Sequence, residues 1–596
     1  MDIYHNPDDY DVSIKNAIFS YIDDYKKAID DITLNIFQGE RLLITGPGGA
    51  GKTTFCCCLN GLVPHFYEGT FSGKIIVKGI DTAQTSIGQL SQKVGVVFQD
   101  PSSQLVSPTV EEELAFGPEN LGIPRDEIKE RINEIIKATR LERFQERQPQ
   151  TLSGGEQQAV AVASILAMHP DICVLDEPTS NLDPIGSSMV LSIAQDLAKR
   201  GEKTLIIVSH KIKEIIPIID TIIIMNEGKI IHRGTPRKVL QNVEFMNKLG
   251  IGGPPVIFLA DKLRKNGLIK SNEDLWISFE EAYTALSNLL KGVSSEKFEN
   301  VLLNWENKKR VLKPSEQGEP VIEVKDLNHV YEIGPGIEGV VALRGVNLNI
   351  FQGEYVGIIG QNGSGKTTLV KHFNGLLKPT EGFVKVFGKD TTKVSIPEMA
   401  KKVNYIFQNP DLQLFGGTVR EEVSFGPKNL GLSEIEVEKR VKSALEELDL
   451  EYAIDRIPRS LDKGGRQRVA IASALSMDPH ILIIDEPTTG QDPKKARQIM
   501  ELTKELNKKG KTIIFITHNM ELAAEYAKRI IVMNNGLLLY DGAVRDAYSQ
   551  TDILEKTYLK PPQITQLAQK LGSYGVPTDI LTIDEMYEVI VELIGE

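Results

Sequence analysis

Short runs of apolar residues recur along this chain, and they predict buried strands. Two of them, Arg41–Thr45 and Tyr355–Ile359, each lead into a glycine-rich segment. The segments that follow, Thr53–Leu62 and Thr367–Leu376, are predicted helices, and both end in Asn-Gly-Leu. Strands that alternate with helices in this way indicate a parallel sheet covered by helices, and therefore an α/β fold.

The same order of elements occurs twice, with an offset of about 310 residues, which indicates an internal duplication. Each half reads as a strand, a glycine-rich loop, a helix, a mixed region and an apolar strand that ends in two carboxylates. The carboxylate pairs are Asp176 with Glu177 and Asp485 with Glu486. Because the order is matched throughout, we treat the chain as two related halves.

Composition narrows the class of protein. The chain has 596 residues, is 41% hydrophobic and has a net charge of −13, so it has material for several cores but no extended basic surface for nucleic acid. The apolar stretch Ile215–Ile224 is interrupted by Pro217 and Asp220, and is shorter than the roughly 20 residues of a membrane-spanning helix. The acidic start and four cysteines without a metal or disulfide spacing predict a protein that stays in the cytoplasm.

The two glycine-rich loops carry the most specific chemical signal. Their glycines allow successive N–H groups to point at a β-phosphate, while a lysine reaches the β- and γ-phosphates and a threonine hydroxyl ligates Mg²⁺. The pattern therefore predicts binding of ATP with Mg²⁺. The predicted nucleotide-binding residues are Gly46, Gly48, Gly49, Ala50, Gly51, Lys52, Thr53, Thr54, Gly360, Asn362, Gly363, Ser364, Gly365, Lys366, Thr367 and Thr368.

The paired carboxylates predict hydrolysis. An aspartate at the end of an apolar strand suits the Mg²⁺ shell, and the adjacent glutamate is placed to polarise a water molecule. In each half a histidine follows the next apolar strand, where it is either a structural residue or a contact of the γ-phosphate. The predicted catalytic residues are Glu177, Glu486, His210 and His518.

The segment Leu152–Glu156, which reads Leu-Ser-Gly-Gly-Glu, precedes a strand that ends in Asp-Glu-Pro-Thr. This combination resembles the ATP-binding cassette (ABC) family over nearly the whole chain, and it implies two tandem P-loop NTPase domains of the ABC type. In that family two such domains pack head to tail, with each ATP between the phosphate loop of one and the signature of the other.

The resemblance also assigns roles to single residues. It implies that the signatures bind ATP through Ser153, Gly154, Gly155, Gly464 and Gly465. It implies that Gln99 and Gln408 join the Mg²⁺ ligands Thr53, Asp176, Thr367 and Asp485, and that Asp183 and Asp492 cross the interface. Tyr21 and Tyr331 are expected to stack on adenine, although an aromatic residue before a strand is also commonly a packing residue.

A narrower resemblance is carried by the segments Phe98–Gln104 with Glu111–Gly122, and Phe407–Gln413 with Glu421–Gly431. They are similar to the ATPases of energy-coupling factor importers, which take up vitamins and cobalt or nickel ions. The similarity implies a peripheral protein at the cytoplasmic face of the membrane. Its partners would be an integral membrane coupling subunit and a substrate-binding membrane subunit, and the latter determines the substrate.

Acidic residues follow the glutamine loop in both halves, at Glu111–Glu113 and Glu421–Glu422. In the importers they meet arginines of the coupling subunit. Glutamate is also favoured at the first turn of any helix, so a solvated helix start is the alternative.

A second repeat follows each half, because Pro254–Leu263 matches Pro561–Leu571. This tail fits the same importer group, where it contributes to the contact between the two ATPase domains. We predict the first nucleotide-binding domain over 1–240, a small mainly helical subdomain over 241–307, a linker over 308–320, the second nucleotide-binding domain over 321–548 and a second small subdomain over 549–596.

The second signature departs from the pattern, because Asp462 replaces serine and Lys463 replaces the first glycine. An ionised aspartate accepts hydrogen bonds and repels a phosphate, whereas a serine hydroxyl can donate. Lys463 can offset that charge, and aspartate is also a good N-cap, which is the structural alternative. We expect one degenerate ATP site, with most hydrolysis in the site that contains Lys366 and Glu486.

A different class remains open at this stage. Soluble proteins with two fused cassettes act on ribosomes in translation, and they too have a long segment between their halves. A function in translation does not account for the repeated tail. We therefore keep it as the alternative to the importer.

Overall fold

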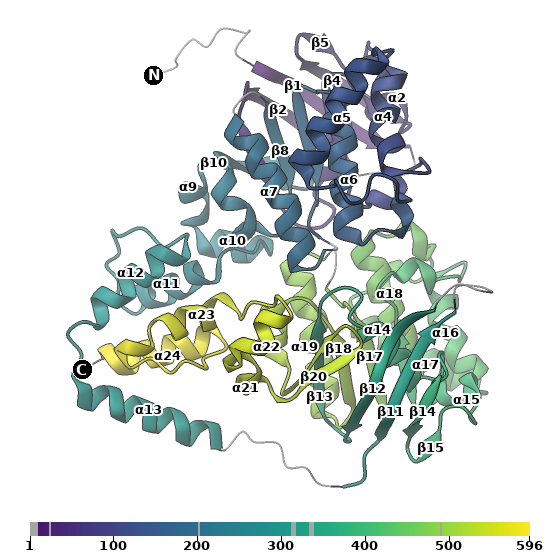
Figure 1. The fold of residues 1–596 in the computed structure, drawn as a ribbon, viewed down its shortest axis with the longest axis vertical. Helices are drawn as coiled ribbons and strands as arrows, with labels where there is room; N and C mark the ends of the chain where they lie inside the picture. The colour runs from purple at the N-terminus through teal and green to yellow at the C-terminus, as the bar shows by residue number, and fades with distance from the viewer. Residues whose placement is uncertain are drawn as a thin grey trace. The chain divides into compact units, whose positions relative to one another are not determined.

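We describe the fold from a computed structural model of the chain, which covers residues 10–22, 26–180, 182–200, 203–310, 318–332, 339–488 and 491–595. The chain divides into two compact units, Met1–Pro254 and Pro255–Glu596, both visible in Figure 1. Each unit contains one copy of the repeated motifs. Among these residues no helix combines the length and the apolar character needed to cross a bilayer.

Unit 1 contains a six-stranded sheet in the order β10-β9-β3-β8-β7-β6, parallel apart from β10. Its strands β6, β7 and β8 are fully buried, as expected for a parallel sheet with both faces covered. The strands are β3 (Arg41–Thr45), β6 (Val94–Val97), β7 (Ile172–Asp176), β8 (Thr204–Val208), β9 (Thr221–Asn226) and β10 (Lys229–Gly234).

A smaller antiparallel sheet of unit 1 has the order β2-β1-β4-β5. Apolar residues of both sheets and of α1, among them Ile36, Ile44 and Phe55, belong to one core. The strands are β1 (Tyr10–Tyr21), β2 (Ile29–Phe37), β4 (Gly69–Val77) and β5 (Ile80–Asp81). The helices are α1 (Lys52–Leu59), α2 (Leu62–His65), α3 (Ile87–Leu90), α4 (Val110–Asn120), α5 (Arg125–Thr139), α6 (Gly154–Ala167), α7 (Pro184–Arg200), α8 (Ile212–Ile215), α9 (Pro236–Leu240) and α10 (Val243–Leu249).

Unit 2 repeats this plan with sheets in the orders β12-β11-β14-β15 and β16-β17-β18-β13-β19-β20. Its strands are β11 (Ile322–Tyr331), β12 (Val340–Ile350), β13 (Tyr355–Gly360), β14 (Glu381–Val386), β15 (Lys389–Asp390), β16 (Val403–Ile406), β17 (Ile481–Asp485), β18 (Thr512–Ile516), β19 (Arg529–Asn534) and β20 (Leu537–Ala543). The cassette helices are α14 (Lys366–Phe373), α15 (Ile396–Ala400), α16 (Val419–Asn429), α17 (Glu434–Glu446), α18 (Lys463–Ser476), α19 (Pro493–Lys508), α20 (Met520–Tyr526) and α21 (Val544–Ser549).

The helices after the glycine-rich loops are shorter than the sequence predicts. The predictions ran to Leu62 and Leu376, whereas α1 ends at Leu59 and α14 at Phe373. Gly61 and Gly375 have φ values of 78° and 75°, and this left-handed conformation ends a helix.

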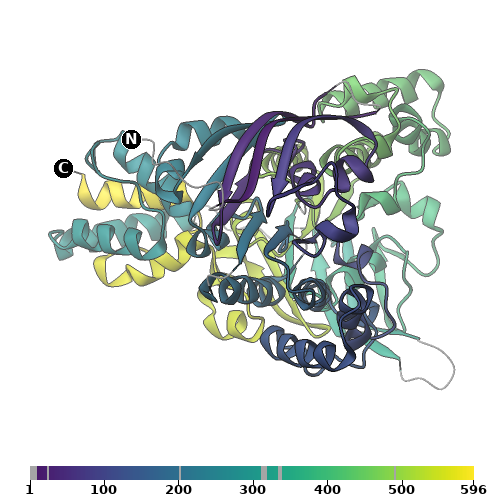
Figure 2. The same ribbon diagram turned by 90° about the horizontal axis from the view of Figure 1, so that it is seen from above.

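Helices from the segment between the halves pack with helices from the C-terminus inside unit 2 (Figures 1 and 2). Trp305 Nε1 donates to Asp579 Oδ1 at 2.7 Å, and Lys308 pairs with Glu588 at 2.5 Å. The elements are α11 (Pro255–Lys265), α12 (Phe279–Leu290), α13 (Ser295–Arg310), α22 (Thr551–Lys556), α23 (Gln563–Lys570) and α24 (Ile583–Ile594). The predicted domain boundaries stay a prediction, and residues 311–317 of the predicted linker lie outside the described residues.

Candidate functional site

Each glycine-rich loop joins a buried strand to a helix, β3 to α1 in unit 1 and β13 to α14 in unit 2. Gly51 and Gly365 precede the helices with φ values of 95° and 100°, a conformation that favours glycine. A Cβ atom on Gly46 or Gly360 would lie 2.0 or 2.3 Å from a backbone carbonyl oxygen of the neighbouring strand. The loops therefore need glycine, and they present backbone N–H groups at a helix N-terminus, where anions bind.

The loop lysines are buried and fold back over their own loops. Lys52 Nζ donates to two loop carbonyl oxygens at 2.9 Å each, and Lys366 Nζ donates to the equivalent pair at 2.9 and 2.6 Å. Both ammonium groups thus lie at the centre of the loop curve, within reach of a phosphate bound there.

The predicted Mg²⁺ ligands come together in both units. Thr53 Oγ1 donates to Asp176 Oδ2 at 2.7 Å, and Thr367 Oγ1 donates to Asp485 Oδ2 at 2.8 Å. Burial raises the pKa of both aspartates, and the threonine hydroxyls partly oppose that shift. A hydroxyl beside a buried carboxylate is an oxygen-only donor set, which fits Mg²⁺.

The two glutamines predicted to join these ligands lie differently. Gln99 Nε2 donates to Ser180 Oγ at 3.3 Å, and Gln408 is exposed. Across the described ranges neither glutamine hydrogen-bonds to the Thr–Asp pair of its own unit. Their role at Mg²⁺ stays a prediction.

The predicted catalytic glutamates have an unusual backbone. Glu177 and Glu486 have φ values of 48° and 50°, which is uncommon for glutamate and concentrates at functional sites. Glu177 Oε1 and Glu486 Oε2 are buried without a hydrogen-bond partner within the described part of the chain. Burial raises the pKa of Glu177, and Lys52 opposes the shift. An orphaned carboxylate oxygen fits a role in holding a water molecule.

The predicted histidines contact these glutamates. His518 Nδ1 lies 2.8 Å from Glu486 Oε1, within hydrogen-bond distance. His210 Nε2 lies 3.5 Å from both Glu177 Oε1 and Lys52 Nζ. The structure therefore assembles a Glu–His pair in each unit, with the shorter contact in unit 2.

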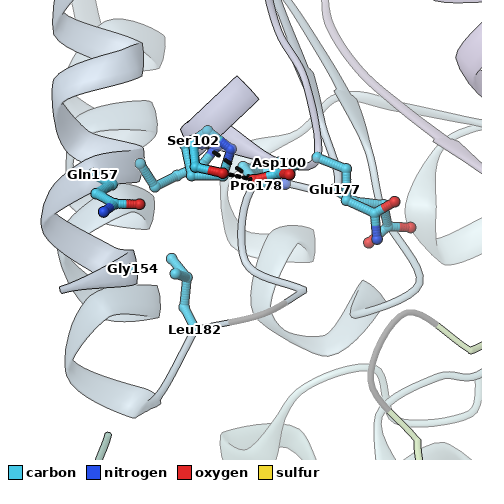
Figure 3. A pocket seen from close by; sticks show the side chains of 10 residues that line it. Asp100, Ser102, Gly154, Gln157, Glu177, Pro178 and Leu182 are labelled. Atoms are coloured by element: carbon cyan, nitrogen blue, oxygen red, sulfur yellow. Dashed lines mark hydrogen bonds between the residues drawn. The ribbon is translucent and has the colours of Figure 1, made fainter. Parts of the chain in front are cut away.

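A cavity of about 140 Å³ lies beside Glu177 in unit 1. Figure 3 shows Gly154 and Gln157 on one helix at one side of the pocket and Glu177 at the other. Asp100 Oδ1 closes its upper edge by accepting from the Ser102 hydroxyl at 2.7 Å. The signature helix, the glutamine loop and the predicted catalytic glutamate of one unit thus line the same hollow.

The two signature helices begin with different caps. Ser153 caps α6 and exchanges hydrogen bonds with Glu156 in a capping box. Asp462 caps α18 by accepting from Gly465 N at 2.7 Å, and Lys495 Nζ lies 2.9 Å from its other oxygen. Burial alone would raise the pKa of Asp462, but Lys495 and the N–H of Gly465 hold it below its ordinary value. The N-cap interpretation is confirmed, and Lys495 is the cation that pairs with Asp462.

The structure also accounts for where the second signature tolerates a side chain. A Cβ atom on Gly154 would meet Leu182 at 3.6 Å, so the equivalent position has space for Lys463. A Cβ atom on Gly155 would lie 2.6 Å from Gly186 Cα, and one on Gly464 would lie 2.6 Å from Gln491 Oε1. The position that keeps glycine in both units is thus closely approached, by backbone in unit 1 and by a glutamine side chain in unit 2.

The tyrosines expected at adenine lie against the loop helices. Tyr21 OH is 3.0 Å from Thr54 Oγ1, and Tyr331 OH is 3.2 Å from Thr368 Oγ1. Tyr331 is 39% exposed, so a face of its ring is accessible. Stacking on adenine stays a prediction.

One expectation about the acidic residues is wrong. Glu113 and Glu422 are only 4% and 1% exposed, and each accepts two backbone N–H groups of the preceding loop. They hold that loop from inside and do not face a partner. Glu111, Glu112 and Glu421 remain exposed.

Two residues near the second site were missed by sequence reasoning. Tyr405 OH donates to Asp485 Oδ2 at 2.7 Å, and Gln361 Nε2 donates to the carbonyl oxygen of Thr557 at 2.8 Å. The aligned residues of unit 1 are Val96 and Pro47, whose side chains have no donor. A position-by-position comparison of the two halves would have drawn attention to both.

Comparisons with known proteins agree with this geometry. The family model described as "ABC transporter" matches residues 29–180 and 343–489. A second model, "AAA domain, putative AbiEii toxin, Type IV TA system", matches residues 464–524 within the second half.

Similar proteins span the whole chain. A putative ABC transporter ATP-binding protein of Caldanaerobacter subterraneus is 42% identical over 97% of this chain and 98% of its own length. One of Methanosarcina acetivorans is 38% identical over 96% and 93%. Among solved structures, cbiO1 of Clostridium perfringens, described as part of the ABC transporter complex cbiONQ, is 37% identical with a TM-score of 0.36. It covers 42% of this chain and 99% of its own.

Both cassettes of the chain have the phosphate loop, the Asp–Glu strand end and the signature helix in the expected places. The chain belongs to the ABC transporter family, as an ATP-binding protein with two cassettes in one polypeptide.

Proposed function

We propose that the chain is the ATP-hydrolysing, energy-coupling subunit of a membrane importer of the energy-coupling factor type. It would work at the cytoplasmic face of the membrane with an integral membrane coupling subunit and a separate substrate-binding membrane subunit. The imported substrate would be a vitamin or a transition-metal ion. ATP binding would close the two cassettes on each other and hydrolysis would reopen them, which moves the coupling subunit.

The surface beside each glutamine loop carries this proposal. Val106 and Phe116 are 64% and 51% exposed in unit 1, and Phe415 and Phe425 are 64% and 49% exposed in unit 2. The two rings of unit 2 pack edge to face at a centroid distance of 4.7 Å. Large apolar side chains held at a surface mark a protein contact. Phe116 and Phe425 lie in the segments similar to energy-coupling factor ATPases, and Val106 and Phe415 lie between the two segments of each half. We therefore assign them to docking of the coupling subunit.

Charge distinguishes the two docking surfaces. Glu111 and Glu112 are exposed in unit 1 and suit arginines of a partner helix. In unit 2 the position of Glu111 is taken by Arg420, which pairs with Glu438 at 2.6 Å. The first surface therefore exposes two glutamates, whereas the second exposes Glu421 beside a pair of packed aromatic rings.

We also propose that the two ATP sites are unequal. In head-to-tail pairing, the site of Lys366 and Glu486 receives Ser153, whereas the site of Lys52 receives Asp462. A unit charge about 4 Å from a phosphate charge is repelled by roughly 4 kcal/mol at an effective dielectric of 20, before Lys495 is counted. Most hydrolysis would therefore occur in the site of unit 2.

Affinity purification tests the importer. The tagged chain would be isolated from detergent-solubilised cells of its own source, beside a Phe116→Asp/Phe425→Asp variant and a control with Phe71→Leu in β4. We expect small integral membrane proteins to accompany the wild-type chain and the control and to be depleted with the double variant. Ribosomal proteins without membrane proteins would overturn the proposal in favour of a soluble ATPase of translation.

A further inference from the structure

Two buried histidines lie under the tyrosine of the second site and have no counterpart in the first. His329 of β11 is 7% exposed and His372 of α14 is completely buried. When the two halves are aligned on their phosphate loops and tyrosines, these positions are occupied by Phe19 and Cys58 in unit 1. The two corresponding tyrosines, Tyr331 and Tyr21, thus have different residues beneath them.

The hydrogen bonds of the histidines determine their protonation. His372 Nδ1 lies 2.8 Å from the carbonyl oxygen of Thr368, and His329 Nδ1 lies 3.2 Å from that of Lys378. A carbonyl oxygen can only accept, so both Nδ1 atoms carry the proton. His372 Nε2 is then an acceptor, and the Nδ1 proton of His329, 3.2 Å away, is shared between it and the Lys378 carbonyl oxygen. The two rings are joined by a directional contact.

Burial keeps His372 neutral. Desolvation lowers the pKa of His372 to about 4. The acceptor nitrogen of His372 therefore keeps its lone pair at physiological pH, and the bond between the two rings persists.

Tyr331 is held from two sides. The His329 ring packs edge to face on the Tyr331 ring at 4.7 Å and 81°, and Thr368 holds the tyrosine hydroxyl. Both supports lead to α14, because Thr368 and His372 lie one turn apart on that helix. The ring of Tyr331 is therefore joined by directional contacts to the helix that begins at the phosphate-loop lysine.

Unit 1 lacks the hydrogen bond behind the supporting ring. Phe19 packs on Tyr21 at 4.9 Å and 78°, and Tyr21 OH lies near Thr54. At the position of His372, however, helix α1 carries Cys58, which belongs to the same core as Phe19 and whose thiol pKa is raised by burial. The two edge-to-face contacts are alike, but a phenylalanine ring has no nitrogen, so no hydrogen bond ties Phe19 to α1 as His329 is tied to α14.

We propose that His372 and His329 are positioning residues for ATP in the second site. They hold Tyr331 in the orientation that receives adenine while α14 holds the phosphates, so that base and phosphates meet a preorganised surface. This inference rests on the proposed role of Tyr331 as the adenine contact.

The test separates adenine binding from phosphate binding. In a Lys52→Ala background, which weakens the first site, titration calorimetry with Mg²⁺ would measure the Kd of ATP and of inorganic tripolyphosphate. The main variant, His329→Phe/His372→Cys, introduces the pair of unit 1. His372→Gln retains an acceptor oxygen for His329, Tyr331→Ala removes the ring, and His480→Phe is a control at an exposed histidine of the same unit.

We expect the double variant to raise the Kd of ATP about five-fold, the size of one lost aromatic contact, and to leave the Kd of tripolyphosphate unchanged. His372→Gln should recover most of that loss, and His480→Phe should change neither value. Equal weakening of both ligands would overturn the inference, because the histidines would then only support α14. No change in either ligand would also overturn it.

If Tyr331 does not contact adenine, the experiment gives a different result. If Tyr331→Ala leaves the Kd of ATP unchanged, Tyr331 does not bind adenine, and the proposed role of the tyrosine falls together with the inference. If Tyr331→Ala weakens ATP alone while the double variant has no effect, the tyrosine role stands and the histidine inference fails.

Discussion

The two cassettes share their phosphate loops and Asp–Glu strand ends, but the groups behind these residues differ. Asp176 accepts a hydrogen bond from Thr53, whereas Asp485 accepts from both Thr367 and Tyr405. Glu177 lies 3.5 Å from its histidine, and Glu486 lies 2.8 Å from its own. The nucleotide-loop side of the second cassette is therefore held by more directional contacts.

The signatures differ in the opposite direction. The first signature keeps Ser153 with its capping box, and the second has Asp462 paired with Lys495. In head-to-tail pairing the well-held loop of unit 2 and the intact signature of unit 1 belong to the same ATP site. The departures in the two halves are therefore complementary, and under the proposed pairing one ATP site would combine the better-held loop with the unaltered signature.

The largest expected effect comes from the catalytic glutamates. Glu486→Gln should lower the ATPase rate by at least about 100-fold, the usual contribution of a positioned general base, whereas Glu177→Gln should lower it by about two-fold or less. Steady-state phosphate release measures both, and nucleotide binding by each variant controls for folding. Equal losses of ATPase rate in the two variants would contradict the proposed inequality of the two ATP sites.

The buried His372 predicts a pH effect on the stability of unit 2. The ordinary pKa of 6.5 applies to the unfolded chain and about 4 to His372 in the fold, so between these values the unfolded chain binds more protons. This group has no effect on the free energy of unfolding above pH 6.5, and its cost grows as the pH falls, to about 2 kcal/mol at pH 5. Urea unfolding at pH 7.5 and 5, compared with His372→Cys, measures it. Parallel losses in both proteins would contradict the prediction.

The hydrogen bond from Tyr405 to Asp485 predicts that loss of this tyrosine weakens Mg²⁺ binding in the second site. Tyr405→Phe removes a hydrogen bond to the Asp485 carboxylate and raises its pKa further, because that bond favours the charged form. We expect the Mg²⁺ concentration for half-maximal ATPase rate to rise about ten-fold, since bonds to charged groups contribute roughly 1.5–3 kcal/mol. The matched control is Tyr355→Phe. Tyr355 lies at the start of β13, whereas Asp485 lies at the end of β17, and the variant loses a buried hydrogen bond to Thr503. An equal rise in the control would remove the specific role of Tyr405.

The smallest expected effect concerns the C-terminal helices. Gln361→Ala removes the bond from the phosphate loop to the Thr557 carbonyl, and we expect α22 to lose about 1 kcal/mol of protection. Amide hydrogen exchange of Thr551–Lys556 reports this directly. Pro47→Ala, at the aligned position of unit 1, should leave exchange in Val243–Leu249 unchanged.

Much of the fold and of the site could be predicted from local motifs in the sequence. Gly46, Lys52 and Asp176 have spacings that only one loop and strand arrangement satisfies, so their neighbours could be placed in advance. The burial of Glu113 could not be seen, because a glutamate in a first helical turn is normally exposed and only the folded loop shows its acceptors. The pairing of Asp462 with Lys495 joins residues on two different helices, so no local pattern contains it.

Vanadate trapping with 8-azido-ATP, followed by peptide mapping of the labelled halves, tests most directly whether hydrolysis is confined to one site. Vanadate retains nucleotide where hydrolysis has occurred, and the azide marks the residues near adenine. We predict that label accumulates on the peptide that contains Tyr331 and only at background level on the one that contains Tyr21. Equal label in both peptides would contradict the inequality of the two sites.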